Sequence, residues 1–297
     1  MNKHQNEELD IEKIKEEISK EKEKPSLSKN QMKKKKEKIN KYTRVGSLIG
    51  FFIIWEIISQ INIIEEWFNP VFLPAPTMII KTAYEYIQAG TLFGHIGISF
   101  FRLITGFIVG TIIAIIMAIW MTKSKLIDNM ISPIINLFGP IPVLAFLPMF
   151  LIWFGIGEGS KITLIAYTTF IAMLPYVRDG INNTDPILIR SAISLGATDF
   201  QVFRKVIFKS AMPNIFSGMK ACLGLAFSSL VVAEMMGADS GLGFIIVDSK
   251  NWFKMSDMFM AAILIGLEYT VMYSILSSIE KVLFKWKRAG VESAVED

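Results

Sequence analysis

Six long apolar stretches, separated by polar or proline-rich segments, dominate the pattern of the chain. The length of each stretch is close to that of a membrane-spanning α-helix, which needs about 20 residues to cross the hydrocarbon core of a bilayer. Lipid offers no hydrogen-bond partners to an open backbone, so a stretch of this length is expected to be helical. The stretches cover residues 44–64, 97–121, 129–154, 160–178, 213–237 and 258–281. We therefore expect an all-α integral membrane protein with about six transmembrane helices.

Lysine and arginine are unevenly shared among the segments that join these stretches. Because basic residues accumulate on the cytoplasmic side of membrane proteins, their distribution predicts orientation. With the N-terminus inside, the outer segments hold only Lys81, Lys161, Lys250 and Lys254. The cytoplasmic segments then hold Lys123, Lys125, Arg178, Arg190, Arg204, Lys205, Lys209, Lys281, Lys285, Lys287 and Arg288. We expect a multi-pass protein of the cell membrane with both termini in the cytoplasm.

The third stretch differs from the others because it is rich in proline. A proline inside a helix removes one hydrogen bond and kinks the chain. Irregular backbone at membrane depth is tolerated only where protein or a watery cavity covers it. We therefore expect this span, or its cytoplasmic half, to pack against other helices rather than lipid. The prolines are Pro133, Pro140, Pro142 and Pro148, and Gly139 precedes one of them.

Residues 1–43 form a charged tail in which nearly every second residue is Lys or Glu. Isoleucines at helical spacing in LDIEKIKEEISK predict a short solvated helix that Pro25 ends, and the composition from Ser26 to Tyr42 is typical of disorder. The KKKK run either attracts anionic lipid or belongs to a solvated tail that sets orientation. We do not expect a secretory signal, because the first apolar run starts only after residue 43 and has the length of a span.

The outer segment between the first two spans contains LPAPTMIIKTAYEYIQAG. Thr77 after Pro76 predicts the start of a short helix, and Gly90 predicts its end. We expect this helix to lie along the outer surface. Its apolar stripe would comprise Ile80, Ala83, Tyr84 and Ile87.

The cytoplasmic segment 179–212 carries strong signals of helix ends. Asp185 followed by Pro186 is an N-cap with proline at the first helical position. The sequence ILIRSAISL then provides one or more turns, and Gly196 is a natural C-terminal stop. A structureless loop of this length would be unusual in a compact protein. We therefore expect a folded segment that begins with a short helix.

A second helix is predicted directly after the first. Thr198 and Gln201 have the spacing of a capping box, and Pro213 suits the start of the fifth span. The two helices would expose small and aromatic residues among basic ones, a surface that another protein can approach closely. The alternative is that this segment packs against its own membrane domain. The residues concerned are Ala192, Gly196, Ala197, Phe200 and Phe203.

Four charged residues, Glu56, Arg102, Glu234 and Glu268, fall within or near the apolar stretches. A charge at the bilayer centre costs about 2.5–3.5 kcal/mol on insertion scales, so such groups face protein or a cavity and find partners. Arg102 and Glu234 both lie toward the outer half of the predicted topology. We expect them to pair or to line the translocation path; the alternative is a position at the interface or a purely structural bond.

Ser228 and Ser229 interrupt the apolar fifth stretch. They are better candidates for lining a path than the surrounding Leu and Val. The alternative is that these serines only let helices pack closely.

The sequence does not predict a disulfide, a metal site, nucleic-acid binding or ATP hydrolysis. The single cysteine excludes an internal disulfide, and the two histidines are too far apart to predict a metal site. A net charge of +4 is too weak and scattered to indicate nucleic-acid binding. The chain contains no G-x-x-x-x-G-K-[ST] phosphate loop, so we do not expect it to hydrolyse ATP itself. No catalytic residue or metal ligand is predicted.

The segment SAISLGATDFQVFRKVIFKSAMP resembles the EAA loop of ABC-importer permeases. In this resemblance Ser191 stands for the Glu of the motif, Ala192 and Ile193 stand for its two Ala, and Gly196 matches. Lys209 stands where the motif usually closes with Pro, and Pro213 follows. From Leu73 to Trp286 the motifs LPAPT, SFFRLITGF, PIPVLAFLPMFLIWFGIGEGSK and LVVAEMMGADSGLG are similar to permeases for sulfonates, taurine and nitrate.

The resemblance implies a type I ABC-importer permease-like bundle over residues 44–288, with a cytoplasmic coupling helix and a short C-terminal tail, 289–297. It implies a homodimer, ABC ATPase subunits that carry ATP and Mg, and an extracytoplasmic binding protein that delivers a small, anionic solute. No cofactor is expected on this chain. The implied ATPase-docking residues are Ser191, Ala192, Gly196, Ala197, Phe200, Phe203 and Arg204. The candidate path residues, chosen above from charge and polarity within the spans, are Arg102, Ser228, Ser229 and Glu234.

Two other classes of protein remain to be weighed against this interpretation. A stand-alone secondary transporter driven by an ion gradient would often show inverted repeats and paired intramembrane carboxylates, and the sequence shows no repeat. A membrane-embedded enzyme would need a cluster of His, Asp or Cys at membrane depth, and none is visible. The importer permease is therefore the predicted function, and the secondary transporter is its alternative.

Overall fold

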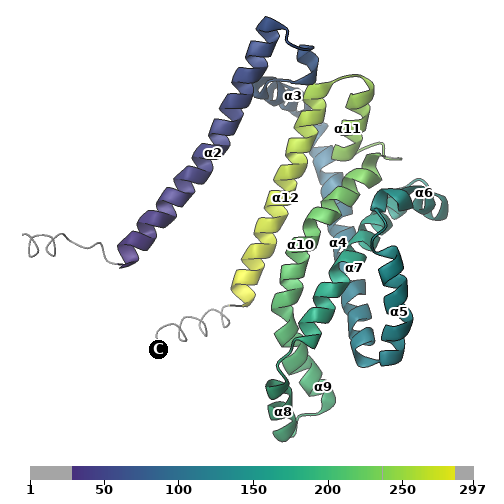
Figure 1. The fold of residues 1–297 in the computed structure, drawn as a ribbon. Coiled ribbons are helices and arrows are strands. Elements are labelled where there is room, and N and C mark those ends of the chain that lie inside the picture. Colours follow the sequence, from purple (N-terminus) through teal and green to yellow (C-terminus); the bar gives the residue numbers. More distant parts are fainter. Residues whose placement is uncertain (1–28, 236, 285–297) are drawn as a thin grey trace, which may run out of the picture. The chain divides into compact units, whose positions relative to one another are not determined.

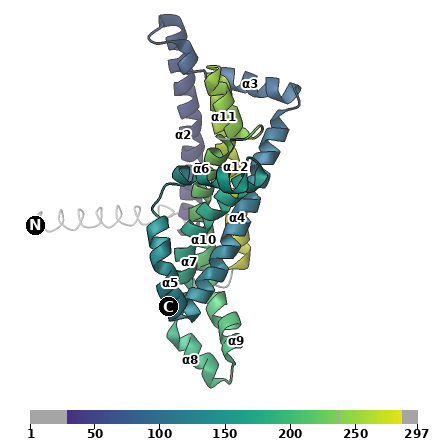
Figure 2. The same ribbon diagram turned by 90° about the vertical axis from the view of Figure 1, so that its right-hand side faces the viewer.

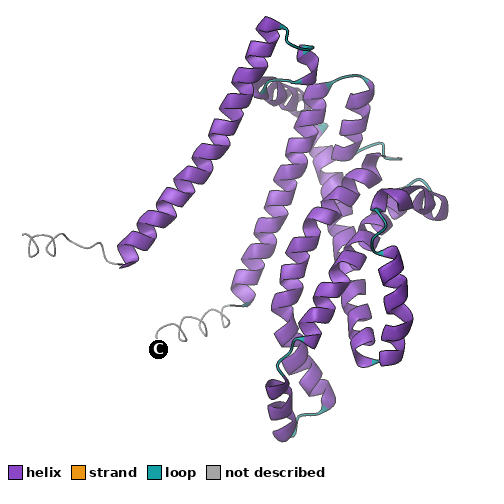
Figure 3. Ribbon diagram, in the orientation of Figure 1, coloured by secondary structure: helices purple, strands orange, loops and turns teal. Residues whose placement is uncertain are grey.

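The computed structural model describes residues 29–235 and 237–284, and within these ranges every regular element is a helix (Figure 3). Internal contacts divide the chain into two units, Met1–Glu65 and Glu66–Asp297. Within the described residues, five helices are long and apolar enough to cross a membrane, or six if one bent pair counts as a span. The expectation of about six predominantly apolar helices is met on length and composition.

The first unit contains one described helix, α2 (Lys29–Glu65). The prediction of disorder up to Tyr42 is wrong from Lys29 onward, because the helix continues through the lysine-rich segment into the apolar run Val45–Glu65. No Gly or Pro lies between residues 29 and 45. Lys, Gln, Met and Glu are good helix formers, and extending an existing helix avoids the cost of nucleation. The short helix predicted before Pro25 lies outside the described residues.

The second unit follows a simple order of helices (Figures 1 and 2). Its long apolar members are α4, α7, α10 and α12, and shorter helices connect them or cover their ends. The elements are η1 (Pro70–Phe72), α3 (Pro76–Gln88), α4 (Leu92–Lys123), α5 (Lys125–Phe138), α6 (Val143–Phe154), α7 (Glu158–Asn182), α8 (Pro186–Ser194), α9 (Asp199–Val202), η2 (Phe203–Ile207), α10 (Phe208–Met235), α11 (Leu242–Asn251) and α12 (Met255–Leu283).

The third predicted span is broken into α5 and α6, whose axes are bent by 106°. The break falls between Phe138 and Val143, where Pro140 and Pro142 remove two nearby backbone donors and follow a glycine. Single prolines do not break these helices, since Pro133 lies inside α5 and Pro148 inside α6. The irregularity expected from the prolines is therefore present, and it is concentrated in one sharp break.

Burial in this pair differs from the expectation. α5, the half expected to be cytoplasmic and covered, contributes no fully buried side chain. The buried side chains come from α6, where Phe146, Leu147 and Phe150 pack with Leu164 of α7 and Ala233 of α10. α5 packs against the main core through half-buried isoleucines: Ile127, Ile131 and Ile135.

The core of the second unit lies between α4, α7 and α10, with Met272 and Leu276 from α12. α4 and α7 approach closely because two glycines four residues apart face α7. A Cβ at Gly106 would lie 2.6 Å from Ile165 Cβ, and one at Gly110 would meet the Ala166 carbonyl oxygen. Small residues at this spacing let transmembrane helices come into backbone contact. This packing fixes α4, and with it Arg102, against the beginning of α7.

The fifth predicted span begins earlier than expected. α9, η2 and α10 form one continuous helical stretch, Asp199–Met235, and Pro213 lies inside it rather than at its start. The five residues Phe203–Ile207 form a wider π-helical turn. A proline in a membrane helix costs one hydrogen bond, which neighbouring helices can cover. The segment 198–212 therefore leads directly into the span.

α3 begins one residue before the predicted cap. Pro76 is in its first turn and Ala75 holds the N-cap position, so the prediction of Thr77 as the cap is wrong. Gly90, with φ +72°, follows the end of the helix as predicted. The predicted stripe does not face the bundle, because Ile79 and Thr82 are the buried residues of α3. Three members of that stripe are exposed: Ile80, Tyr84 and Ile87.

Tyr86 ties α3 to the beginning of α12. Its hydroxyl donates a hydrogen bond to Asp257 Oδ2 over 3.0 Å. Burial, together with this hydrogen bond to a carboxylate, raises the pKa of Tyr86 to about 12. The phenol therefore stays a donor over the whole physiological pH range.

Candidate functional sites

Arg102 is the centre of a charged cluster at the end of the bundle where α7 begins and α10 ends. Its side chain, on α4, is fully buried. Nε and Nη2 bind Glu158 in a bidentate pair of 2.6 Å contacts, while Nη1 donates to Glu234 Oε1 at 2.8 Å and to the Ser240 carbonyl at 2.7 Å. Bidentate charge-assisted hydrogen bonds are among the strongest in proteins. They explain how a guanidinium is tolerated in an apolar helix.

Glu234, near the end of α10, is equally enclosed. Its carboxylate accepts from Ser99 Oγ, 2.8 Å from Oε1, and from the Gly243 amide, 2.8 Å from Oε2. Gly243 belongs to the first turn of α11, so this carboxylate also caps that helix. The buried ion pair with Arg102 is therefore embedded among further hydrogen bonds, which a buried ion pair requires to offset its desolvation.

The turn between α10 and α11 is held by α4 as well. The Gly241 amide donates to His95 Nδ1 at 3.0 Å, and the Leu242 amide donates to Ser99 Oγ at 2.8 Å. The His95 ring stacks on Phe244, with 6.2 Å between ring centroids. Three consecutive amides, 241–243, thus find acceptors on α4 and α10. Gly241 has φ +119°, and a Cβ there would come within 2.5 Å of the Glu234 Cδ atom.

Glu158 is the half-exposed member of the cluster. It is the first residue of α7, and its side chain keeps 44% of its accessible surface. Besides Arg102 it binds Lys161 Nζ at 3.1 Å, and the Lys161 side chain is only 4% exposed. Two cations and two carboxylates therefore balance each other. Arg102 offers no unpaired charge in this arrangement.

The pairing of Arg102 with Glu234, one of the two alternatives expected from the sequence, is present. Lining of a path by these two residues stays a prediction. Sequence reasoning missed Glu158, Ser99 and His95. A signal for two of them was available, because His95, Ser99 and Arg102 follow each other at spacings of four and three and so share one face of an apolar helix.

The two serines of α10 have different surroundings. Ser229 is buried, and its hydroxyl donates to the Ala226 carbonyl at 2.8 Å, the arrangement of a helix-packing serine. Ser228 is exposed, and its hydroxyl donates to the Gly224 carbonyl at 3.0 Å. Ser217 and Ala221 lie on the same exposed face of α10. Of the pair, only Ser228 is exposed, and lining of a path by either serine stays a prediction.

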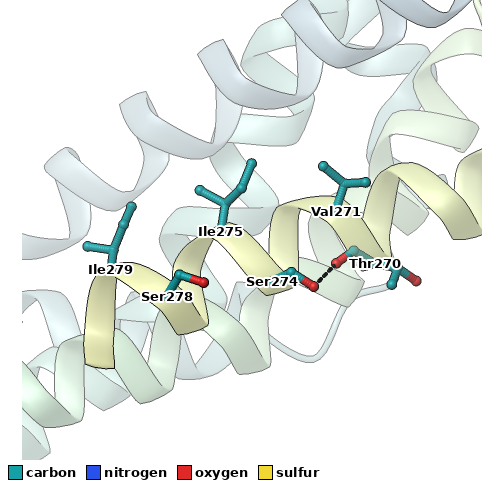
Figure 4. Close-up of a pocket in the computed structure, with 6 residues that line it drawn as sticks. All are labelled: Thr270, Val271, Ser274, Ile275, Ser278 and Ile279. Carbon is teal, nitrogen blue, oxygen red and sulfur yellow. Dashed lines mark hydrogen bonds between the residues drawn. The ribbon is translucent and has the colours of Figure 1, made fainter. Parts of the chain in front are cut away.

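Two grooves lie on α12. One, with a volume of about 430 Å³, is lined by three hydroxyl and three aliphatic side chains (Figure 4). Two of its hydroxyls bond to their own helix: Ser274 donates to the Thr270 carbonyl at 2.7 Å, and Thr270 donates to the Gly266 carbonyl at 2.8 Å. The second groove is lined by Glu268 and apolar residues of α4 and α12. Glu268 is 8% exposed, and its carboxyl oxygens have no hydrogen-bond partner among the described residues.

The loop formed by α8 and α9 is a second candidate site at the other end of α10. The cap predictions are confirmed here. Asp185 accepts from the Ile187 amide at 2.8 Å, Gly196 has φ +80° after the end of α8, and Thr198 and Gln201 form the reciprocal capping box. These local bonds satisfy the helix ends without help from the bundle.

This loop projects beyond the long helices in both views (Figures 1 and 2). α8 has no buried residue, and Leu195 and Phe200 expose 88% and 67% of their surface. The alternative in which the loop packs against its own bundle therefore does not hold for α8. Exposed apolar residues of this size, rimmed by polar ones, are typical of a protein-binding surface.

Phe203 is less exposed than Phe200. It is half-buried, 6.4 Å from the ring centroid of Phe208, with Lys123 Nζ of α4 4.7 Å from its ring centroid. Lys123 therefore covers part of the Phe203 ring, and a docking role for Phe203 stays a prediction. Of the other predicted docking residues, Ala192 and Ala197 are half-exposed, and the exposed ones are Ser191, Gly196, Phe200 and Arg204.

Comparisons with known proteins agree with this arrangement. Residues 110–289 match the family described as binding-protein-dependent transport system inner membrane component. The chain is 33% identical to the putative aliphatic sulfonates transport permease protein SsuC of Bacillus subtilis, over 80% of this chain and 84% of that protein. It is 34% identical to the taurine transport system permease protein TauC of Escherichia coli, over 74% and 80%.

Solved structures agree on the fold. The chain superposes with a TM-score of 0.59 on a chain from inward-facing conformations of the MetNI methionine ABC transporter, with 17% sequence identity, over 66% of this chain and 97% of that one. The chain is a multi-pass membrane protein that belongs to the family of binding-protein-dependent transport system inner membrane components, the permeases of ABC importers, and it has their all-helical type I fold.

Proposed function

We propose that this chain is the transmembrane permease subunit of an ATP-binding-cassette importer for a small, anionic solute of the sulfonate, taurine or nitrate type. A binding protein on the outer side would deliver the solute, and a separate subunit would bind Mg and hydrolyse ATP. The α8–α9 loop carries the proposal, because it exposes large apolar side chains while its helix ends are already satisfied. The relatives named for sulfonate and taurine transport support the substrate class.

The proposed orientation places the α8–α9 loop and both termini in the cytoplasm. It rests on the excess of Lys and Arg in the segments on that side. The Arg102 cluster then lies near the outer face, at the other end of α10. A homodimer would enclose the path, and we assign Ser228, on the exposed face of α10, to its lining. Ser229 would pack the bundle, and Arg102 with Glu234 would flank the outer end of the path.

The continuity of the helical stretch Asp199–Met235 suggests how ATP drives transport. Its 37 residues run from the α8–α9 loop to Glu234. At 1.5 Å per residue this stretch is about 55 Å long. ATP binding by the partner would draw the two docked loops together, and the helix would carry this movement to the outer end. Hydrolysis would then reset the loops.

Phe200→Asp provides the test. The exposed ring would be replaced by a carboxylate in the docking surface, and we expect at least a tenfold loss of both ATPase co-purification and ATP-driven uptake in proteoliposomes. Trp252→Asp is the matched control, because Trp252 is 71% exposed at the other end of the molecule, between α11 and α12. The control should retain the ATPase subunit. Uptake by the chain alone, under an ion gradient without ATP, would contradict the proposal and favour a secondary transporter.

A further inference from the structure

We propose that Glu158 is a displaceable counter-ion, and that Arg102 and Lys161 form a cradle for an anionic oxoacid group, sulfonate or carboxylate, when the Glu158 carboxylate moves out. The inference rests on the proposed function only for the choice of sulfonate as the probe. It adds to that function a specific pair of cations for the anionic group and an internal competitor for their site.

Three donors converge on the Glu158 carboxylate from two buried cations. Arg102 Nε and Nη2 are each 2.6 Å from one of its oxygens, and Lys161 Nζ is 3.1 Å from Oε1. Arg102 is 0% and Lys161 is 4% exposed, whereas Glu158 is 44% exposed. A guanidinium fork with a neighbouring ammonium matches two oxygens of a sulfonate as well as it matches a carboxylate.

The other carboxylate of the cluster would stay in place. Glu234 is 0% exposed and is also held by Ser99 and the Gly243 amide. It binds Arg102 through Nη1, the same nitrogen that reaches the Ser240 carbonyl. If Glu158 left, Nε and Nη2 of Arg102 and Nζ of Lys161 would lose the partners described here, while Nη1 would keep both of its own. The cradle would therefore persist without its present occupant.

Glu158 is placed so that it can leave. Its exposed carboxylate would regain hydration on moving outward, which a fully buried carboxylate could not do without crossing protein. It follows the segment Gly155–Gly157, in which Gly155 has φ +77° and a Cβ on either glycine would meet no atom within 4 Å. This uncrowded segment can adjust without disturbing α7. An incoming anion would replace one carboxylate at the cations, so the cluster would remain neutral.

Glu158→Gln tests the proposal in the full-length chain, reconstituted in nanodiscs of phosphatidylcholine so that no lipid is anionic. Sodium methanesulfonate is the probe, at constant ionic strength, and dimethyl sulfone is its uncharged counterpart. The substitution removes the Glu158 carboxylate that competes for Arg102 and Lys161. Methanesulfonate binding should therefore strengthen at least tenfold, because the probe no longer has to displace this carboxylate. Glu280→Gln is the matched control, since Glu280 pairs with Lys220 outside the cluster. Binding is measured by isothermal titration and by the shift in thermal unfolding.

Equal methanesulfonate binding by the two variants, or an equal response to dimethyl sulfone, would overturn the proposal. A response that appears only after phosphatidylglycerol is added would assign the cradle to a lipid headgroup and overturn its role for a free solute. If Glu158→Gln does not fold, carbodiimide labelling of the wild-type chain replaces it. Methanesulfonate should then increase labelling of Glu158 but not of Glu280, and unchanged labelling of Glu158 would refute the displacement. None of these measurements involves the ATPase, so their outcome is independent of the docking test.

Discussion

At the scale of single residues, the Glu234 carboxylate lies where a side chain at residue 241 would be, so Gly241 and Glu234 depend on each other. The Glu234 carboxylate occupies the space that a side chain at residue 241 would need, and it accepts the amide of Gly243. The backbone at Gly241, with φ +119°, is also one that L-residues rarely adopt. A single buried carboxylate therefore dictates both the sequence and the conformation of the turn between α10 and α11.

Gly241→Ala should destabilise this turn by roughly 1–3 kcal/mol, because the methyl group would collide with Glu234 and the left-handed backbone would be strained. Thermal unfolding in detergent, together with hydrogen exchange of the α11 amides, measures the loss. Gly266→Ala serves as the control, since a Cβ at Gly266 would have no atom within 4 Å. Equal behaviour of the two variants would show that Glu234 does not occupy the position described.

Helix ends account for most of what could be predicted at the scale of elements. Asp185, Gly196 and the Thr198–Gln201 pair were predicted correctly because caps depend on a few neighbouring residues. The break of the third span needed a choice among four prolines, and local rules do not say which of them neighbouring helices will cover. Pro213 was assigned to a helix start for the same reason, although it lies inside α10.

Contacts between elements were harder to predict than their ends. Pairing of Arg102 with Glu234 could be named in advance as one alternative, because few charges lie in the apolar stretches. Glu158 could not be predicted as a partner of Arg102, because a carboxylate at the beginning of a span is common. Only the packing of α4 on α7 brings it to Arg102. The amphipathic pattern of α3 predicted a helix correctly. It did not predict that the apolar stripe is exposed, because the pattern does not distinguish contact with lipid from contact with protein.

Gly110→Ala probes the packing of α4 on α7 that brings these charges together. A Cβ at Gly110 would meet the Ala166 carbonyl oxygen and lie 2.8 Å from Thr169 Cβ, so the helices must separate. Overpacking of this kind costs about 1–3 kcal/mol. Thermal unfolding should show the loss, whereas Gly97→Ala on the same helix, with no atom within 4 Å of the added Cβ, should keep stability or raise it slightly because alanine favours a helix over glycine. A stable Gly110→Ala protein would contradict the close approach of α4 and α7.

In the second unit as a whole, one helical stretch connects the exposed α8–α9 loop to the charged cluster. The stretch Asp199–Met235 begins in the α8–α9 loop and ends beside Glu234, which in turn holds Arg102 and the start of α11. Sequence reasoning identified both ends but separated them at Pro213. The continuous stretch changes the mechanical interpretation, because on the proposed function a movement of the loop would reach the cluster through one helix, in which the π-helical turn and Pro213 are the irregular positions.

Softening this helix near the loop should therefore uncouple transport from ATP hydrolysis. Lys205 and Lys209 are exposed, so replacing both by glycine removes no buried contact while it weakens the helix by about 1 kcal/mol per glycine relative to alanine. We expect the ATPase subunit to co-purify as before, and uptake per ATP hydrolysed to fall several-fold in proteoliposomes. The double alanine variant removes the same two charges but preserves the helix, so it should transport normally. Equal coupling in the glycine and alanine variants would mean that the force reaches the cluster by another route, and the continuous helix would then be only a structural connection.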